Sequence, residues 1–188
     1  MSERGKLSIV SANRHKFLEL AELAKDRGIK VEFANLSKVE IQANSLLEVS
    51  RTGAMLAFSQ LQRPLIVEDA GLFVEALNGF PGPYSSYVFK TIGIEGILDL
   101  VRDRTDRSAF FQSVITYVDR EQVVSFEGKV EGEIALSPRG RGGFGFDPIF
   151  IPRGSKLTFA EMDVRTKNLL SHRAVAFSKF LDFYAPRR

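Results

Sequence analysis

The first 70 residues alternate between short apolar runs and segments with a helical period, and this alternation most constrains the fold. Residues 6–10 have the pattern of a short buried strand, and residues 17–28 have helical composition and end at a glycine. Residues 29–36 alternate like a half-buried strand. A second helix is expected after Ser45, its N-cap, and the apolar residues 64–69 suit a buried strand. The β-α-β-α-β order predicts an α/β domain with crossover connections.

The second half of the chain is less regular. Residues 108–119 and 121–136 suit two long strands joined by a short polar turn, which predicts an antiparallel hairpin and therefore a mixed sheet. Residues 72–77 suit a further strand, 79–87 a loop rich in turn residues, and 93–103 a helix. Near the C-terminus, one helical face carries apolar side chains at Leu170, Ala174, Phe177, Leu181 and Tyr184.

Composition narrows the class of protein. A chain of 188 residues without an internal repeat or linker predicts one domain spanning residues 1–188. The absence of cysteine excludes disulfides, thiolate metal sites and cysteine nucleophiles. A net charge of +3 slightly favours anionic small molecules and does not argue for nucleic acid. No apolar run reaches the roughly 20 residues of a membrane span, and no signal-peptide cleavage site is visible. We therefore expect a cytoplasmic protein with neither a membrane nor a nucleic-acid partner.

The polar turn "SANRHK", residues 11–16, follows the first expected strand and leads into a helix. Ligands of open α/β sheets bind beyond the carboxyl ends of strands, and helix N-termini attract anions. Asn13 and Lys16 would add a hydrogen-bond donor and a positive charge. The alternative is a solvated turn capped by Ser11. A Walker phosphate loop is absent from the sequence.

Two acids, Glu68 and Asp69, stand where the apolar strand of residues 64–69 is expected to end. Neighbouring residues of a strand point to opposite faces, so one of the two would face a given site. A carboxylate there could bind Mg²⁺ through oxygen and orient a water molecule. Alternatively, both acids are surface groups that cap the following turn. Glu40 is a candidate second ligand.

The segment "SPRGRGGFGFDPIF", residues 137–150, combines glycine, arginine and spaced aromatic residues. RNA-binding RGG segments occur as repeats in disordered tracts, whereas this segment occurs once between apolar segments. A phosphate nest, a stacking surface for a purine base, and a glycine-kinked strand with buried phenylalanines all remain open. The stacking surface would be formed by Phe144 and Phe146.

The segment "KNLLSHR", residues 167–173, is rich in hydrogen-bond donors. An isolated histidine is more often structural than catalytic, and His172 has no partner at metal-ligand spacing in the sequence. Ser171 is expected to cap the final helix, which would leave His172 and Arg173 at its positive end.

Taken in order, these segments closely resemble the Ham1-type inosine triphosphate pyrophosphatases over about residues 7–184. The resemblance rests on "SANRHK", "VEIQ", "VEDAGLFVEAL", "GFPGPYSS", "GGFGFDPIF" and "TFAEM…KNLLSHR". It implies an α/β fold with a mixed, elongated central sheet, flanking helices and two lobes around a nucleotide cleft. It also implies a homodimer, Mg²⁺ as cofactor, and hydrolysis of ITP, dITP and XTP to the monophosphate and pyrophosphate, which cleanses the nucleotide pool.

The same resemblance assigns roles to individual residues. Glu40 and Asp69 would bind Mg²⁺, and Asp69 would accept the proton of the attacking water. The triphosphate would contact the turn formed by Ser11, Ala12, Asn13, Arg14, His15 and Lys16. The remaining substrate contacts would come from Ala70 and from the base-binding residues Phe144, Gly145, Phe146, Asp147, Lys167, His172 and Arg173.

Selectivity follows from the implied donors. Hypoxanthine and xanthine present an oxygen acceptor at position 6, so Lys167 and Arg173 would favour them over adenine, whose amino group would face other donors. Guanine shares the oxygen, and its exclusion must depend on the 2-amino group.

The chain departs from many family members at Ala70, where serine is common, and at Gly53, where some carry a phosphate-binding lysine. The alternatives are a Maf-type nucleotide pyrophosphatase and a non-catalytic nucleotide- or RNA-binding protein.

Overall fold

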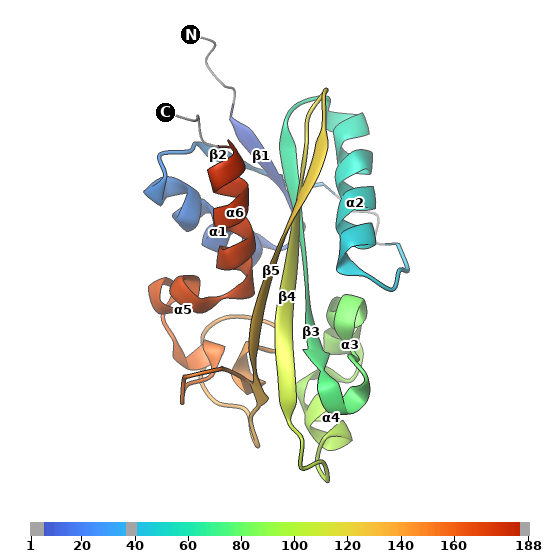
Figure 1. Cartoon of the computed structure of the whole chain (residues 1–188), viewed down its shortest axis with the longest axis vertical. Helices are drawn as coiled ribbons and strands as arrows, with labels where there is room; N and C mark the ends of the chain where they lie inside the picture. The colour runs from blue at the N-terminus through green and yellow to red at the C-terminus, as the bar shows by residue number, and fades with distance from the viewer. Residues whose placement is uncertain (1–5, 37–40, 185–188) are drawn as a thin grey trace. The chain divides into compact units, whose positions relative to one another are not determined.

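The computed structural model describes residues 6–36 and 41–184, and its elements are labelled in Figure 1. Six strands form one sheet in the order β2-β1-β3-β4-β5-β6. β1 pairs in parallel with β2 and β3, whereas β5 pairs antiparallel with β6. The strands are β1 (Leu7–Val10), β2 (Val31–Ala34), β3 (Leu65–Val74), β4 (Ser108–Val118), β5 (Val123–Ile134) and β6 (Phe150–Pro152). The expected mixed α/β fold is therefore confirmed.

Helices flank this sheet. They are α1 (Arg14–Asp26), α2 (Leu46–Leu61), α3 (Ser85–Thr91), α4 (Gly93–Leu100), α5 (Val164–Leu170) and α6 (His172–Tyr184). Short 3₁₀ turns include η3 (Asp147–Ile149) and η4 (Phe159–Glu161). Within the described ranges, no helix has both the length and the apolar character needed to cross a membrane.

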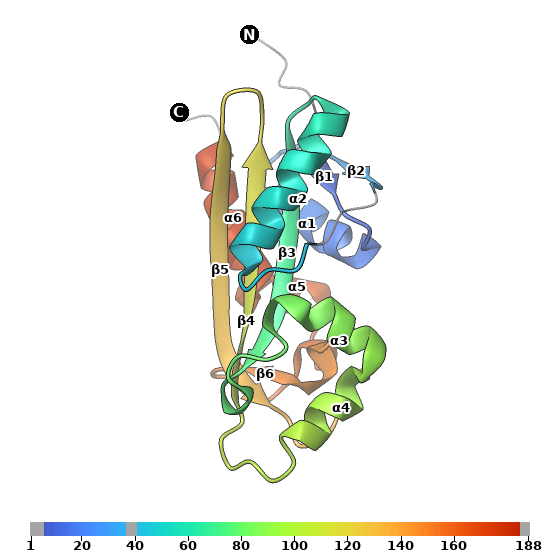
Figure 2. The ribbon, with the colours of Figure 1, turned by 90° about the vertical axis from the view of Figure 1, so that its right-hand side faces the viewer.

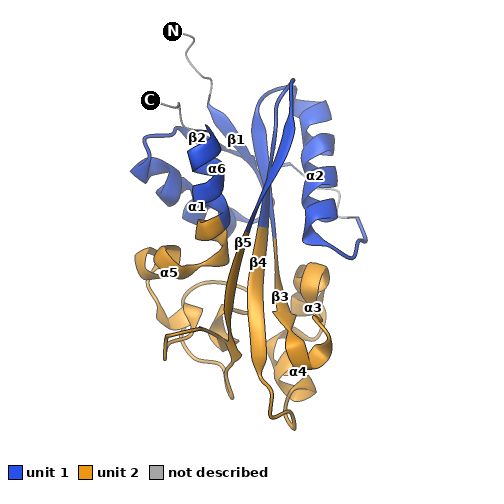
Figure 3. Cartoon of the chain, in the orientation of Figure 1, with its two compact units in different colours: residues 1–69, 114–127, 176–188 blue, residues 70–113, 128–175 orange. Residues whose placement is uncertain are grey.

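The chain divides into two compact units, shown in Figure 3. The first unit contains residues 1–69, 114–127 and 176–188, and the second contains residues 70–113 and 128–175. β3, β4 and β5 each contribute residues to both units. The single domain expected for residues 1–188 remains a prediction.

In the first unit, helices cover both faces of the sheet, as Figures 1 and 2 show. Side chains of α1 and α6 pack on one face together with Leu7, Ile9 and Ile66. On the opposite face, Ala54 and Ala57 of α2 pack against a second apolar cluster that includes Val10, Leu65 and Val67. The alternation Leu65, Ile66, Val67 between two buried faces explains why the β3 sequence is apolar without interruption.

The second unit is built around aromatic rings. Phe111, Phe150 and Phe159 are buried together, with centroid separations of 4.8 Å between Phe111 and Phe150 and 5.1 Å between Phe150 and Phe159. Leu72, Ile97, Ile134 and Ile149 are fully or almost fully buried in the same cluster. Phe146 belongs to the same cluster, so four of the 16 phenylalanines of the sequence are buried in this core.

Three expectations about elements were wrong. β3 continues to Val74, so residues 72–77 are not a separate strand. The segment 79–87 is a loop rich in turns only as far as Tyr84, because α3 begins within it at Ser85. The Ser85 hydroxyl donates to the Gly82 carbonyl at 2.7 Å and accepts the Leu72 amide at 2.8 Å, which ties the start of α3 to β3. Finally, the C-terminal apolar face is divided, because Leu170 ends α5 and α6 begins at His172.

Candidate active site

The turn at residues 11–16 is held by side-chain hydrogen bonds. The Asn13 Oδ1 atom accepts the amide of His15 at 2.9 Å and that of Lys16 at 3.4 Å, so Asn13 is the N-cap of α1. Ser11 acts one step earlier, because its hydroxyl accepts the Asn13 amide at 3.0 Å. The cap of α1 is therefore Asn13, and not Ser11 as in the alternative reading of this turn. Side chains that the sequence suggested for ligand binding also fix the backbone of the turn.

The register of the sheet brings this turn next to the two acids. β1 pairs with β3 from Ser8↔Leu65 to Val10↔Val67 and then leaves the sheet. The next residues of β3 are Glu68 and Asp69, so they lie beside the point where the chain turns towards α1. The sequence predicted that the strand ends at these acids. This prediction was wrong, because β3 continues for five further residues, to Val74. A strand backbone, and not a loop, therefore positions both carboxylates.

Lys16 and Glu68 form an ion pair that the sequence did not predict. The Lys16 Nζ atom lies 2.8 Å from Glu68 Oε2 and 3.5 Å from the Glu68 carbonyl oxygen. The Glu68 side chain is only 2% exposed, against 19% for Lys16. Strand alternation assigns Glu68 to the sheet face of Ile66, and Asp69 to the face of Leu65 and Val67, which α2 covers. Only one of the two acids therefore shares a face with α1.

The metal-binding prediction is partly outside the described residues. Glu40 is not described, while Asp69 is buried, with 8% of its surface exposed. Across residues 6–36 and 41–184, no three acidic or histidine side chains come together as a complete metal site. Carboxylate oxygen is nevertheless the donor that Mg²⁺ prefers, so Asp69 is chemically suited to the predicted role.

In the second unit, Asp147 connects two of the predicted base-binding residues. Its Oδ2 atom accepts the backbone amide of Phe144 at 2.8 Å and the Lys167 ammonium at 2.7 Å. A Cβ atom on Gly143 would lie 2.2 Å from the same oxygen, and Gly143 has a φ of +67°. Glycine is therefore required at this position if the Asp147 carboxylate is to reach the Phe144 amide.

The Phe144 ring is faced by two cationic side chains. The Lys167 Nζ atom lies 4.9 Å from its centroid, and the Arg173 Cζ atom lies 5.3 Å from it. Both cations are almost completely buried, at 3% and 2% exposure, whereas Phe144 is half-buried. Cation–π attraction therefore holds the ring in place. The structure thus brings Phe144, Asp147, Lys167 and Arg173 together, and their contacts with a substrate remain predictions.

Phe146 and His172 lie deeper in the second unit. Phe146 is 3% exposed and packs edge-on against Phe89 at 5.4 Å, which corresponds to the buried-phenylalanine alternative for this segment. The His172 ring stacks on Phe111 at 4.6 Å with an interplanar angle of 10°. The Ser171 hydroxyl accepts the Ala174 amide at 3.1 Å, which confirms the expected cap at the start of α6. Substrate contacts of Phe146, Gly145 and His172 remain predictions.

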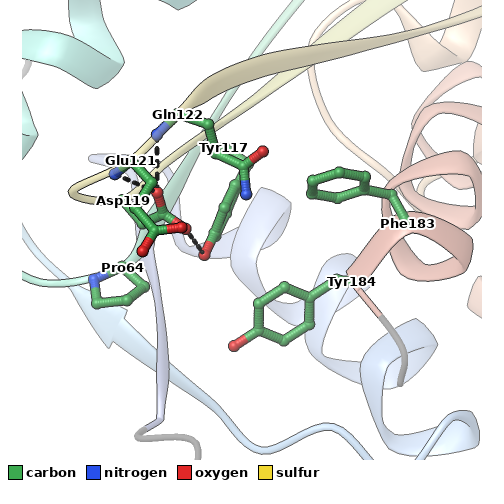
Figure 4. A pocket seen from close by; sticks show the side chains of 7 residues that line it. All are labelled: Pro64, Tyr117, Asp119, Glu121, Gln122, Phe183 and Tyr184. Atoms are coloured by element: carbon green, nitrogen blue, oxygen red, sulfur yellow. Dashed lines mark hydrogen bonds between the residues drawn. The ribbon is translucent and has the colours of Figure 1, made fainter. Parts of the chain in front are cut away.

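A separate pocket of the first unit contains none of the predicted site residues (Figure 4). Its volume is about 310 Å³, and its lining residues are Pro64, Tyr117, Asp119, Glu121, Gln122, Phe183 and Tyr184. The Asp119 carboxylate accepts the amides of Glu121 and Gln122 and the Tyr117 hydroxyl. Burial raises the pKa of Asp119, but these hydrogen bonds outweigh it and lower the pKa. This carboxylate therefore closes the β4–β5 turn.

With an α/β sheet, an N-capped turn beside two acids and a cation-faced aromatic ring, the molecule has the parts of a nucleotide-processing enzyme. The chain belongs to the Ham1 family, whose model matches residues 7–183. It is 50% identical to a "dITP/XTP pyrophosphatase" of Saccharolobus solfataricus, over 97% of this chain and 96% of the relative. It is 52% identical to a "dITP/XTP pyrophosphatase" of Hyperthermus butylicus, over 96% of each chain. Membership of this family decides against the Maf-type alternative.

A solved structure agrees with the fold. A HAM1 protein from Coxiella burnetii superimposes with a TM-score of 0.83 at 32% identity, covering 95% of this chain and 98% of the other. The similarity thus extends over the residues of both units.

Proposed function

We propose that this protein hydrolyses non-canonical purine nucleoside triphosphates, namely dITP, ITP and XTP, to the monophosphate and pyrophosphate. The observation that carries the proposal is 50% identity over nearly the full length to a relative named as a dITP/XTP pyrophosphatase. Removal of these nucleotides would keep deaminated purines out of the nucleotide pool.

The triphosphate would bind at the turn of residues 11–16. The N-terminus of α1 favours negative charge, and its cap by Asn13 holds the turn in one conformation. Lys16 is the cationic residue of this turn that forms an ion pair with β3. Its contact with Glu68 holds the ammonium beside that strand. An ammonium has three donors, so Lys16 can keep Glu68 as a partner while it donates to a phosphate oxygen.

Asp69 would accept the proton of the attacking water while the bond between the α- and β-phosphates breaks. Pyrophosphate then leaves, and Lys16 offsets part of its charge. We propose that Asp69 and Glu40 hold Mg²⁺, which when bound neutralises phosphate charge and makes water a better nucleophile. Burial of Asp69 on a strand would fix the direction in which this carboxylate points.

The purine base would stack on Phe144, the half-buried ring that the Lys167 and Arg173 side chains face. Both side chains are donors only, so they suit the 6-oxo group of hypoxanthine and xanthine and leave the adenine amino group without an acceptor. Asp147 would hold Lys167 and the Phe144 backbone in fixed positions, because its Oδ2 atom accepts hydrogen bonds from both.

We further propose that the active protein is a homodimer in the cytoplasm, as its resemblance to the Ham1-type enzymes implies. Multi-angle light scattering of the purified protein should give twice the mass of the 21.0 kDa chain. A monomer mass at the concentration of the activity assay would contradict the dimer without affecting the proposed reaction.

A pyrophosphate-release assay tests the reaction. The protein with Mg²⁺ should release pyrophosphate from ITP, dITP and XTP, and much more slowly from ATP, GTP and dUTP. The first products from ITP should be IMP and pyrophosphate. Initial formation of IDP and orthophosphate, or equal rates with ATP and ITP, would contradict the proposal.

A further inference from the structure

The loop that carries Phe144 is fastened to the short turn η4. The Thr158 hydroxyl donates to the Arg139 carbonyl at 2.9 Å, and the Gly142 amide donates to the Ala160 carbonyl at 2.9 Å. Thr158 is fully buried, although Arg139 and Gly142 are exposed. Two hydrogen bonds therefore connect an exposed glycine-rich loop to a buried segment about 20 residues further along the chain.

Glu161 also connects η4 with the start of the loop. Its Oε2 atom accepts the Thr158 amide at 2.7 Å and lies 3.6 Å from Arg139 Nε. The Arg139 guanidinium also donates to the Lys156 carbonyl at 3.0 Å. One carboxylate oxygen thus organises η4 and holds the arginine at the start of the loop.

Gly140 shows how closely the loop and η4 approach each other. A Cβ atom at this position would lie 2.3 Å from the carbonyl carbon of Ala160, and the φ of Gly140 is +82°. Any side chain would force the two backbones apart. The loop is therefore seated on η4 by backbone contact as well as by side chains.

The same turn reaches the second base-binding element. The Phe159 ring of η4 lies 5.6 Å from the Lys167 ammonium and packs on Phe150 and Phe111 in the aromatic core. η4 consequently contacts both the loop of Phe144 and the ammonium that Asp147 binds. None of its residues is among those assigned to the substrate from the sequence.

We propose that Thr158 and Glu161 are positioning residues for base recognition: they hold the Phe144 loop at the height and angle at which a purine stacks. The proposal rests on the proposed function and deepens it by locating the part of the chain that sets the affinity for the base. Because these residues lie in the second unit and their side-chain contacts described outside η4 are with Arg139 at the start of the loop, they should leave the binding of phosphate groups unchanged.

The kinetic test uses Thr158→Val, which keeps the shape and removes the hydroxyl, and Glu161→Gln, which keeps an acceptor and removes the charge. We expect KM for ITP to rise about fivefold, the size of one net hydrogen bond, at a kcat changed by less than about twofold. The inhibition constant of IMP should rise in parallel, whereas that of pyrophosphate should stay constant. Glu131→Gln is the matched control, because it removes another ion pair of the second unit, with Arg153 at 2.6 Å.

A double-mutant cycle isolates the ion pair. Arg139→Gln and Glu161→Gln should each raise the IMP inhibition constant, and the double variant should be no worse than the stronger single variant. Additive effects would show that the two residues act independently. A parallel rise of the IMP and pyrophosphate constants, with a fall in melting temperature, would show a purely structural role and overturn the proposal.

A second measurement does not depend on activity. The chain contains four tyrosines but no tryptophan, so Phe144→Trp introduces into the loop a single tryptophan, which can be excited selectively at longer wavelength than tyrosine. Adding Thr158→Val should lower its fluorescence anisotropy and raise its quenching by acrylamide, and adding Glu131→Gln should change neither. Unchanged anisotropy in the Thr158→Val background would overturn the proposal. If the unmodified protein releases no pyrophosphate from purine triphosphates, the proposed function fails, and the anisotropy still decides whether η4 positions the loop.

Discussion

The Lys167 ammonium and the Asp147 carboxylate lie 2.7 Å apart with side-chain exposures of 3% and 4%. The carboxylate oxygen that binds Lys167 also accepts the Phe144 amide at 2.8 Å. A buried ion pair contributes little net stability by itself, because desolvation of both charges offsets their attraction. What the pair does here is to connect the loop that carries Phe144 with α5, whose Lys167 faces the Phe144 ring.

Removal of one partner should therefore be costly. We expect Asp147→Ala to lower the free energy of unfolding by about 3–5 kcal/mol, because the Lys167 ammonium would remain buried without its carboxylate. Urea unfolding followed by circular dichroism measures the change. The double variant Asp147→Ala, Lys167→Met should recover part of the loss, and a double variant less stable than Asp147→Ala would contradict this account.

Two interactions should contribute to recognition of the purine base, namely stacking on Phe144 and hydrogen bonds from Lys167 and Arg173. Phe144→Ala should weaken ITP and ATP alike, by about 1–3 kcal/mol in apparent affinity, because every purine offers the same stacking face. Lys167→Met and Arg173→Met should lower kcat/KM for ITP far more than for ATP, so the ratio of the two should fall. Equal losses for both nucleotides in all three variants would mean that the donors do not determine base choice.

Asp69 should control turnover more than binding. Asp69→Asn keeps the shape of the side chain and removes its basicity, so kcat for ITP should fall by at least about 10²-fold while KM changes less. Single-turnover kinetics with saturating nucleotide separates the two parameters. A variant that retains more than about a tenth of the turnover would remove Asp69 from the proposed role.

Metal removal should stop the reaction and leave the fold intact. After dialysis against EDTA, pyrophosphate release should fall below detection and return on addition of Mg²⁺, because the triphosphate charge needs a cation beyond Lys16. The far-ultraviolet circular dichroism spectrum should not change, since no described contact of the fold requires a metal. Full activity in EDTA would contradict the proposed cofactor.

The start of α5, the helix that carries Lys167, should depend on pH. The backbone amide of Thr166, followed by its hydroxyl, donates to Asp163 and holds the pKa of this carboxyl below its usual value. A lowered pKa in the folded state means that the stabilisation is complete above about pH 4 and is lost as the pH falls through the lowered pKa. Asp163→Asn, which can still cap the helix, should therefore cost stability at neutral pH and lose this cost in acid. A cost that is independent of pH would contradict the assignment.

The sequence predicted those parts of the molecule whose signals are local. Ser45 is the cap of α2, accepting the Glu48 amide at 3.2 Å, and the β1–α1–β2 pattern is visible in the order of residues. α3 was missed because its composition suits a loop, and its start depends on contacts of Ser85 with a residue 13 positions away. The Lys16–Glu68 pair joins residues 52 apart, and no periodicity within either segment reports it.

For the candidate site, the sequence suggested which residues belong together but not the contacts between them. The sequence grouped Phe144, Asp147 and Lys167 by their resemblance to a family, and the structure supplies the shared oxygen that connects them. Phe146 lies two residues from Phe144, yet its ring is buried in the core, just before the 3₁₀ turn that begins at Asp147. Spacing alone did not distinguish the two rings, because backbone direction in a glycine-rich segment is not encoded by hydrophobic period.

The shared Asp147 oxygen has a consequence for how this protein can change. Because one atom orders both the stacking residue and a donor, a mutation that alters either also disturbs the other, and their effects on substrate choice should show strong epistasis. New base preferences would then be reached through compensated pairs of substitutions rather than single steps. A combinatorial library at positions 144, 147 and 167 should accordingly contain functional triplets whose individual members are inactive.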